Sequence, residues 1–162
     1  MTMDAIDELV ARSKDHQVLR AFHEAHRANP HILDFLVQEI QLRLDAGFSA
    51  FSYHNLWQYS RWKIERDHGP NATFYLNDRA TAFYARAITI LHPQYNGRCE
   101  FRRSMADAVF GTRIEPASKL RVKNYSRRLE WADGTPLTEG WRPTVPHVAL
   151  LAAATRADIH TR

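Results

Sequence analysis

The spacing of apolar residues is the feature that most constrains this chain, because as far as residue 91 it largely follows the helical period. The clearest stretch begins at Asn29-Pro30, where asparagine is a good N-cap and proline suits the first helical position. Gly47 then supplies a left-handed stop, and Phe48 follows as the apolar contact beyond it. We therefore expect a helix over 30–46, whose single apolar stripe is Ile32, Phe35, Leu36, Ile40 and Leu44.

Similar patterns predict further helices on both sides of this one. Residues 4–27 carry an apolar stripe, but the polar interval 11–17 leaves open whether they form one helix or two. Ser52 is a plausible N-cap for a helix over 53–66. Asn77 and Asp78 favour the start of a helix over 77–91, which His92-Pro93 ends because the residue before proline avoids helical geometry.

The β-structure expected is small. Residues 74–76 suit a short strand, and 98–103 alternate like a strand after the turn signal Asn96-Gly97. Residues 105–110 suit one or two helical turns, 119–131 alternate basic and apolar residues, and 145–154 suit a short closing helix. The predicted fold class is mainly α with a small β component. Residues 1–104 would form a helical, three-helix winged-helix-like core, and 105–162 an irregular basic C-terminal arm or extension.

Charge is distributed unevenly along the chain. Lys and Arg number 22 against 18 Asp and Glu, a net charge of +4, and the first residues are neutral or acidic. Between Arg98 and Arg128 the only acids are Glu100, Asp107 and Glu115. Such an asymmetry favours a nucleic acid or an acidic partner.

Several classes of protein are disfavoured. The single cysteine, Cys99, cannot form an internal disulfide, and no apolar run is long enough for a membrane span. The N-terminus lacks the apolar core of a secretion signal. We expect a cytoplasmic protein, in the bacterial host cytoplasm if the chain is phage-encoded.

The predicted order of three helices, a turn and a basic strand is that of a winged helix, whose third helix enters the major groove. On this interpretation Arg79, Arg86 and Thr89 lie on the outer face of helix 77–91, opposite its apolar stripe. Arginine reads guanine and grips phosphates, so these residues would contact DNA. The competing interpretation is that they are ordinary solvated residues on a helix surface.

Two further basic segments are candidate nucleic-acid contacts. Arg98, Arg102 and Arg103 would clamp phosphates from a wing, or would merely protect an edge strand from aggregation. Single-stranded nucleic acid is bound by cations that contact its phosphates and by aromatic rings that stack on its bases. The arm around Tyr125 has both kinds of residue. A solvated hairpin explains that arm equally simply and is favoured; its candidate contacts are Lys119, Arg121 and Lys123.

Metal and catalytic signatures are weak. His23 and His26 have the i, i+3 spacing of a metal pair, but no recognised ligand set is completed, so we expect no metal and no cofactor. No phosphate loop, nucleophile elbow or paired-carboxylate motif is present in the sequence. Arg98 and Arg102 could lower the pKa of Cys99, but a buried structural thiol is favoured.

The ordered motifs of residues 20–103 resemble a family of small uncharacterised proteins from phages and prophages. The residues that carry the resemblance are Phe22-His23-Glu24-Ala25, Asn29-Pro30-His31, Phe51-Ser52, Leu56-Trp57, Arg61-Trp62, Phe74-Tyr75-Leu76-Asn77-Asp78, Phe83-Tyr84-Ala85-Arg86, Pro93 and Phe101-Arg102-Arg103. The family has no assigned activity, so the resemblance implies a phage context and no mechanism. Family members tend to have a second asparagine where Asp78 stands, and residues from Met105 onward lie outside the resemblance.

The leading functional hypothesis is a non-enzymatic, phage-type nucleic-acid-binding protein, with double-stranded DNA favoured and a regulatory role expected. The alternative is a phage-type protein that docks on a host protein and modulates it, using tryptophan anchors. Those candidate anchors are Trp57, Trp62, Trp131 and Trp141. A nuclease is the third hypothesis, and it lacks a metal-ligand constellation in the sequence.

Overall fold

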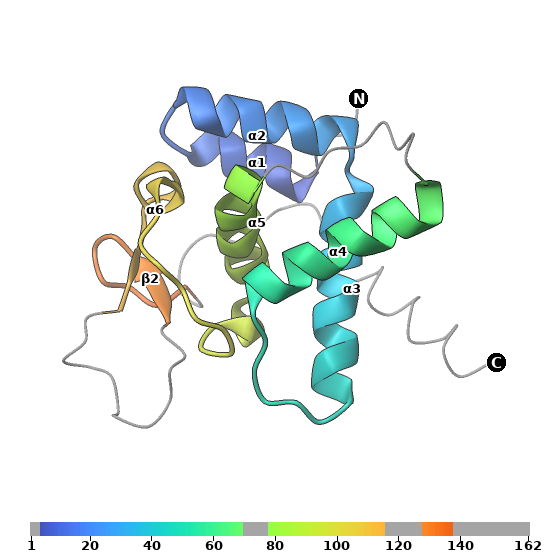
Figure 1. Ribbon diagram of the computed structural model, residues 1–162. Helices are drawn as coiled ribbons and strands as arrows, with labels where there is room; N and C mark the ends of the chain where they lie inside the picture. The colour runs from blue at the N-terminus through green and yellow to red at the C-terminus, as the bar shows by residue number, and fades with distance from the viewer. Residues whose placement is uncertain (1–3, 70–77, 116–127, 138–162) are drawn as a thin grey trace.

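The structure, a computed structural model, describes residues 4–69, 78–115 and 128–137. It is mainly helical with a small antiparallel sheet, as the sequence predicts (Figure 1). The elements are, in chain order, α1 (Ala5–Arg12), α2 (Gln17–Ala28), α3 (His31–Asp45), α4 (Tyr53–His68), α5 (Asp78–Leu91), the 3-10 turn η1 (Pro93–Tyr95), α6 (Met105–Phe110), β1 (Thr112–Ile114) and β2 (Leu129–Trp131).

Local capping chemistry explains where these helices begin and end. Asp4 accepts hydrogen bonds from the backbone N–H groups of Ile6 and Asp7 and so caps α1, while the polar interval separates α1 from α2. Ser52 caps α4 as predicted. Asn29 was expected to cap α3, but its side chain instead donates to the carbonyl of Ala25 at 3.1 Å and ends α2.

Helix α5 is the centre of the fold. It contacts α1, α2, α3, α4, α6 and η1, and in Figure 1 it stands upright with α1 and α2 across its top, α3 and α4 to one side, and α6 and β2 to the other. Eight consecutive residues, 83–90, are buried. A helix surrounded in this way has no solvent face over that stretch.

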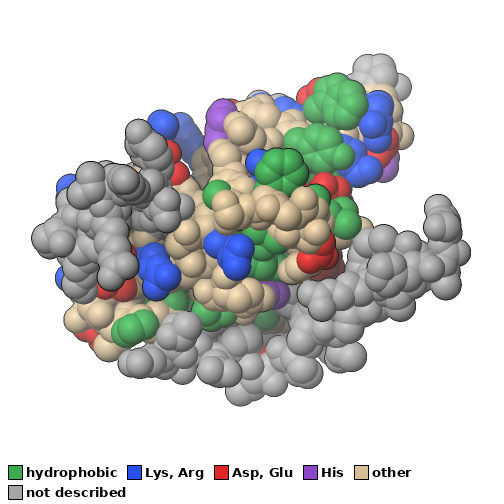
Figure 2. Space-filling view, turned by 90° about the horizontal axis from the view of Figure 1, so that it is seen from below, with side chains coloured by type: hydrophobic (Ala, Val, Ile, Leu, Met, Phe, Trp, Pro, Cys, Tyr) green, Lys and Arg blue, Asp and Glu red, His purple; other side chains and the backbone are tan. Residues whose placement is uncertain are grey.

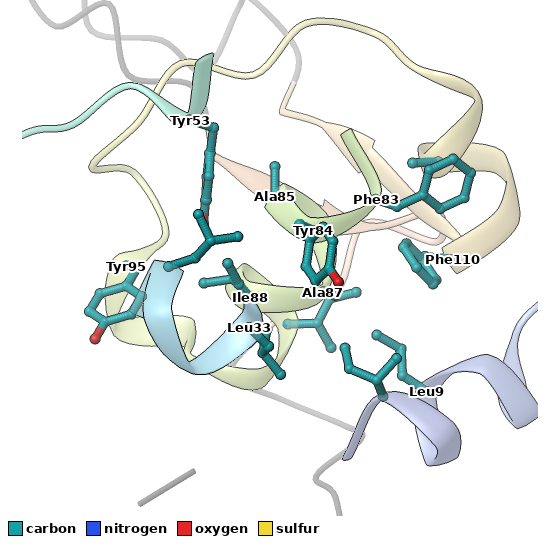
Figure 3. Packing of buried hydrophobic residues seen from close by; sticks show 14 of the residues in the cluster. Leu9, Leu33, Tyr53, Phe83, Tyr84, Ala85, Ala87, Ile88, Tyr95 and Phe110 are labelled. Carbon is teal, nitrogen blue, oxygen red and sulfur yellow. The ribbon is translucent and has the colours of Figure 1, made fainter. Parts of the chain in front are cut away.

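Aromatic and aliphatic side chains from described elements far apart in the sequence meet on α5 (Figure 3). Phe83 stacks on Phe22 of α2 with ring centroids 5.3 Å apart and meets Phe110 of α6 edge-on at 5.7 Å. Tyr84 lies 5.5 Å from the buried indole of Trp57 on α4. Because such aromatic pairs bury large areas, they account for much of the core's stability.

The predicted division at residue 104 does not separate α6 and the sheet from the helices. Ala106, Val109, Phe110, Leu129 and Leu137 belong to the same hydrophobic core as α1–α5. In the sheet, Thr112 pairs with Trp131 and Ile114 with Leu129. The described parts of 105–137 are therefore part of the core, whereas residues 138–162, including the helix expected at 145–154, lie outside the described residues.

The strand expected at 98–103 does not form as a strand. Within this segment only Cys99 makes a β-bridge, a parallel one to Phe51. The alternation of the sequence nevertheless reflects burial, because Cys99 and Phe101 point into the core and are 1% and 2% exposed. The strand expected at 74–76 lies outside the described residues.

Candidate nucleic-acid interface

Arg86 is buried and does not lie on an outer helix face, so the prediction that it contacts DNA is wrong. Its Nε donates to Asp107 Oδ1 at 2.8 Å, and its Nη2 donates to Asp107 Oδ2 at 2.9 Å. The same Nη2 donates to the carbonyl oxygen of Arg102 at 2.6 Å. The residue is 3% exposed, and its guanidinium lies 5.2 Å from the ring centroid of Phe101. This arginine is a structural clamp between α5, α6 and the segment before α6.

Thr89 is also buried, and its predicted role in DNA contact is wrong for the same reason. Its hydroxyl donates to the carbonyl of Ala85 at 2.8 Å and lies 3.1 Å from the hydroxyl of Tyr53. The residue is 0% exposed. The predictions for Arg86 and Thr89 fail for one reason. Other helices pack on several sides of α5, whereas the apolar stripe in the sequence marks only one of those sides.

Arg79 is exposed at the start of α5, near α2. It lines a small hollow with residues of α2, among them Gln17, Val18 and Ala21. The segment 98–103 follows the opposite end of α5, beyond η1 (Figure 1). Arg79 and Arg86 therefore do not form the shared basic helix face that a groove-reading helix requires.

The segment 98–103 presents Arg98, Arg102 and Arg103 to solvent. The backbone that carries them is fixed at both ends. The carbonyl of Arg98 accepts a hydrogen bond from Phe51 N at 2.8 Å, and that of Arg102 accepts from the Arg86 clamp. The buried side chains of Cys99 and Phe101 hold the middle. We call residues 98–103 the basic segment.

Arg128 lies beside the basic segment because the sheet is attached there. The side chain of Asn96 accepts from Leu129 N at 2.9 Å and donates to the Leu129 carbonyl at 2.8 Å. Gly97 has a φ of +81°, and a Cβ there would lie 2.9 Å from Nε of Arg128. Glycine thus permits both the turn and the close passage of this arginine.

These four exposed arginines have no ion pair with the described part of the chain, unlike several other arginines. Arg113, for comparison, is 2.7 Å from Glu130, and Arg61 pairs with Asp78. Lys119, Arg121 and Lys123 lie outside the described residues, in the stretch that joins Glu115 to Arg128. Glu115 N donates to the Arg128 carbonyl at 2.8 Å, so the two described residues that flank this stretch lie side by side.

The histidines predicted as a weak metal pair have structural partners. His23 Nε2 lies 2.5 Å from Asp7 Oδ1, and His26 lies 3.2 Å from both Asp4 Oδ2 and the Tyr84 hydroxyl. The hydrogen bond from His26 lowers the pKa of Asp4 to about 2. Among the residues that the structure describes, no group of three or more such side chains is placed to hold a metal ion.

Cys99 is a buried thiol, as favoured from the sequence. Burial raises its pKa to about 12, although Arg86 opposes this shift. The proposed influence of Arg98 and Arg102 is therefore outweighed by desolvation, and the thiol is a core side chain rather than a nucleophile.

Sequence reasoning missed an aromatic surface formed by α3, α4 and the loop between them. Of the candidate tryptophan anchors, Trp57 is 2% exposed and Trp62 is 55% exposed. Trp131 is partly buried in the sheet, and Trp141 lies outside the described residues. Trp62 lies beside exposed Tyr59, three residues earlier on α4, a neighbour that helical spacing alone could have revealed. Exposed Phe48 precedes α4 in the sequence, and only the packing of α3 against α4 places it at the same hollow as Tyr59.

None of the described helices is both long and apolar enough to cross a bilayer. No protein-family model matches the chain, and the searches of curated proteins and of solved structures likewise returned no match. The resemblance to small phage proteins therefore stays a prediction.

Proposed function

We propose that this protein is a non-enzymatic nucleic-acid-binding protein whose contact surface is the basic segment with Arg128. The observation that carries the proposal is that Arg98, Arg102, Arg103 and Arg128 stand exposed on a fixed backbone without acidic partners among the described residues. Cations without internal partners are available to phosphates, and neutralised phosphates release counterions on binding.

The proposed surface differs from a winged-helix reading of double-stranded DNA. That reading needs α5 in a major groove, but residues 83–90 are buried, so α5 supports the contact surface from behind. The sequence of 116–127 adds Lys119, Arg121, Lys123 and Arg127 without any acid, and the residues that flank it, Glu115 and Arg128, are hydrogen-bonded to each other. In the phage context that the resemblance implies, we expect a regulatory rather than a catalytic role.

The test is fluorescence anisotropy with labelled 20-nucleotide single strands and 20-base-pair duplexes at 50–300 mM KCl. We expect log K to fall linearly with log salt, and Arg102→Glu/Arg103→Glu to lower affinity by at least about tenfold and to make the salt dependence shallower. The matched control is Lys14→Glu/Arg20→Glu, which makes the same change of net charge at exposed residues near α1 and α2. Absence of binding at 50 mM salt, or equal losses in both variants, would contradict the proposal.

A further inference from the structure

A groove between α3 and α4 adjoins the basic segment. Its volume is about 630 Å³, within the range of roughly 300–1,000 Å³ that accommodates small ligands. Ile40, Phe51 and Leu56 give it an apolar lining, and Phe48 and Tyr59 contribute aromatic rings. Glu39 is the acid among the described lining residues; burial raises its pKa, and the positive charge of Lys63 partly opposes that shift.

Three exposed rings, which we call the aromatic row, lie at this groove: Phe48 and Tyr59 line it, and Trp62 lies beside Tyr59. Phe48 is 53% exposed, Tyr59 42% and Trp62 55%. The rings of Tyr59 and Trp62 are 6.3 Å apart, and Tyr59 stacks on Phe35 at 6.5 Å. Isolated exposed apolar residues are ordinary, but several aromatic rings in one row mark a binding surface.

Cations lie over these rings. The guanidinium of Arg43 is 4.2 Å from the centroid of Phe48, that of Arg66 is 4.8 Å from Trp62, and the ammonium of Lys63 is 5.9 Å from Phe35. Arg66 and Lys63 also pair with Asp67, at 2.9 Å and 3.6 Å, so Arg43 is the cation of the three that has no ion pair within the described residues. The view from below shows hydrophobic side chains with Lys and Arg side chains directly beside them (Figure 2). Aromatic faces alternating with cations are the composition of surfaces that hold single-stranded nucleic acid.

Arg43 is positioned to receive an anion at the groove. Its Nε donates to the carbonyl of Ala50 at 3.0 Å, and the ring of Phe48 supports the guanidinium plane. No carboxylate of the described chain pairs with it, so its two terminal nitrogens are available as donors. A guanidinium held in this way suits a phosphate oxygen.

Phe51 connects the groove to the basic segment. Phe51 lines the groove and also makes the β-bridge to Cys99, with its N–H donating to the Arg98 carbonyl. The backbone that carries Arg98 therefore lies next to a lining residue of the groove.

We propose that the α3–α4 groove binds unpaired bases, so that the nucleic acid recognised by this protein is single-stranded. The inference rests on the proposed function and specifies its ligand. The bases would stack on Tyr59 and Trp62, while Arg43 and then the basic segment follow the phosphates. A duplex keeps its bases stacked inside the helix and offers these rings no π-face, whereas an unpaired strand does. A protein partner would also use the rings, but the unpaired guanidinium of Arg43 and the exposed arginines of the basic segment favour a ligand that carries phosphates.

The experiment compares labelled dT20, rU20 and a 20-base-pair duplex DNA, by anisotropy, in the full chain and its variants. Tyr59→Ala and Trp62→Ala should each weaken binding of the single strands by about tenfold and leave duplex binding unchanged, since stacking contributes only where bases are free. Met105→Ala removes an exposed apolar side chain elsewhere, on α6, and should change affinity less than twofold. The dT20 and rU20 arms distinguish DNA from RNA as the source of the strand.

The two proposals fail in different ways. If Arg102→Glu/Arg103→Glu weakens binding but Tyr59→Ala and Trp62→Ala do not, the groove inference is overturned and nucleic-acid binding stands. If no oligonucleotide binds, the proposed function itself fails, and the aromatic row becomes a surface for a protein partner. Circular dichroism of each variant confirms that the exposed substitutions leave the helices intact.

Discussion

At the scale of single residues, the Arg86–Asp107 pair carries the clearest energetic consequence. The Asp107 side chain is 14% exposed and also accepts from Ser104 N at 2.9 Å, so it depends on Arg86 for a compensating charge. Arg86→Met keeps much of the volume but leaves that carboxylate without its cation. We expect a loss of about 3–5 kcal/mol in the free energy of unfolding, measured by urea denaturation.

A matched control separates this structural role from surface charge. Arg20 forms an exposed pair with Asp15 at 3.5 Å, and Arg20→Met should change stability by less than about 1 kcal/mol. If Arg86→Met were as mild as Arg20→Met, Arg86 would not be the clamp described above.

We expect His92 to make the stability of the protein depend on pH. Burial lowers its pKa to about 4, its ring stacks on Tyr95 at 5.4 Å, and its Nε2 has no hydrogen-bond partner among the described residues. Below pH 6.5 this imidazole is protonated in the unfolded chain, whereas in the folded chain it stays neutral until the pH approaches 4. Stability conferred by the neutral form is therefore complete above pH 6.5 and is lost as pH falls from 6.5 towards 4.

We expect His92→Phe to remove this part of the acid sensitivity, up to about 3 kcal/mol between pH 7.5 and pH 4. The measurement is urea unfolding of both proteins at the two pH values. His54→Gln, at an exposed position, should retain the wild-type loss. An undiminished pH dependence in His92→Phe would show that other groups are responsible.

At the scale of elements, helix positions were predictable because their signals are local. The helix expected over 30–46 is α3 at 31–45, that over 77–91 is α5 at 78–91, and the turns at 105–110 are α6. Apolar spacing and caps act within a few residues, so the sequence alone reveals them. Phe83, Tyr84 and Ile88 are core residues as their stripe predicts.

The surroundings of each element were not predictable in the same way. The local sequence around Arg86 indicates a surface residue, because its ion-pair partner, Asp107, is 21 positions later in the chain. Phe48 was expected to cover the end of α3, but it is 53% exposed and receives Arg43 on its ring instead. The candidate groove likewise arises from how α3 packs against α4, which no local pattern encodes.

At the scale of the whole molecule, one β-bridge connects the two proposed contact surfaces, the α3–α4 groove and the basic segment. The bridge between Phe51 and Cys99 fastens the α3–α4 loop to the basic segment, and Asn96 fastens that segment to β2. Elements that are far apart in the sequence thus meet at residues 96–103. A strand of nucleic acid lying along them would contact parts of the chain from α3 to the sheet.

Because the core is built from segments on both sides of residue 104, we predict that residues 1–104 cannot fold alone. A chain ending there loses Val109, Phe110, Leu129 and Leu137 from the core, and Arg86 loses Asp107. Removing Phe110 alone, as Phe110→Ala in the full chain, should already lower the free energy of unfolding by about 3–5 kcal/mol, comparable with the total stability of many small domains. We therefore expect the 1–104 fragment to show weak helicity and no cooperative urea transition by circular dichroism, whereas the full chain unfolds cooperatively. A sharp transition of the fragment at the full chain's midpoint would instead establish 1–104 as an independent domain.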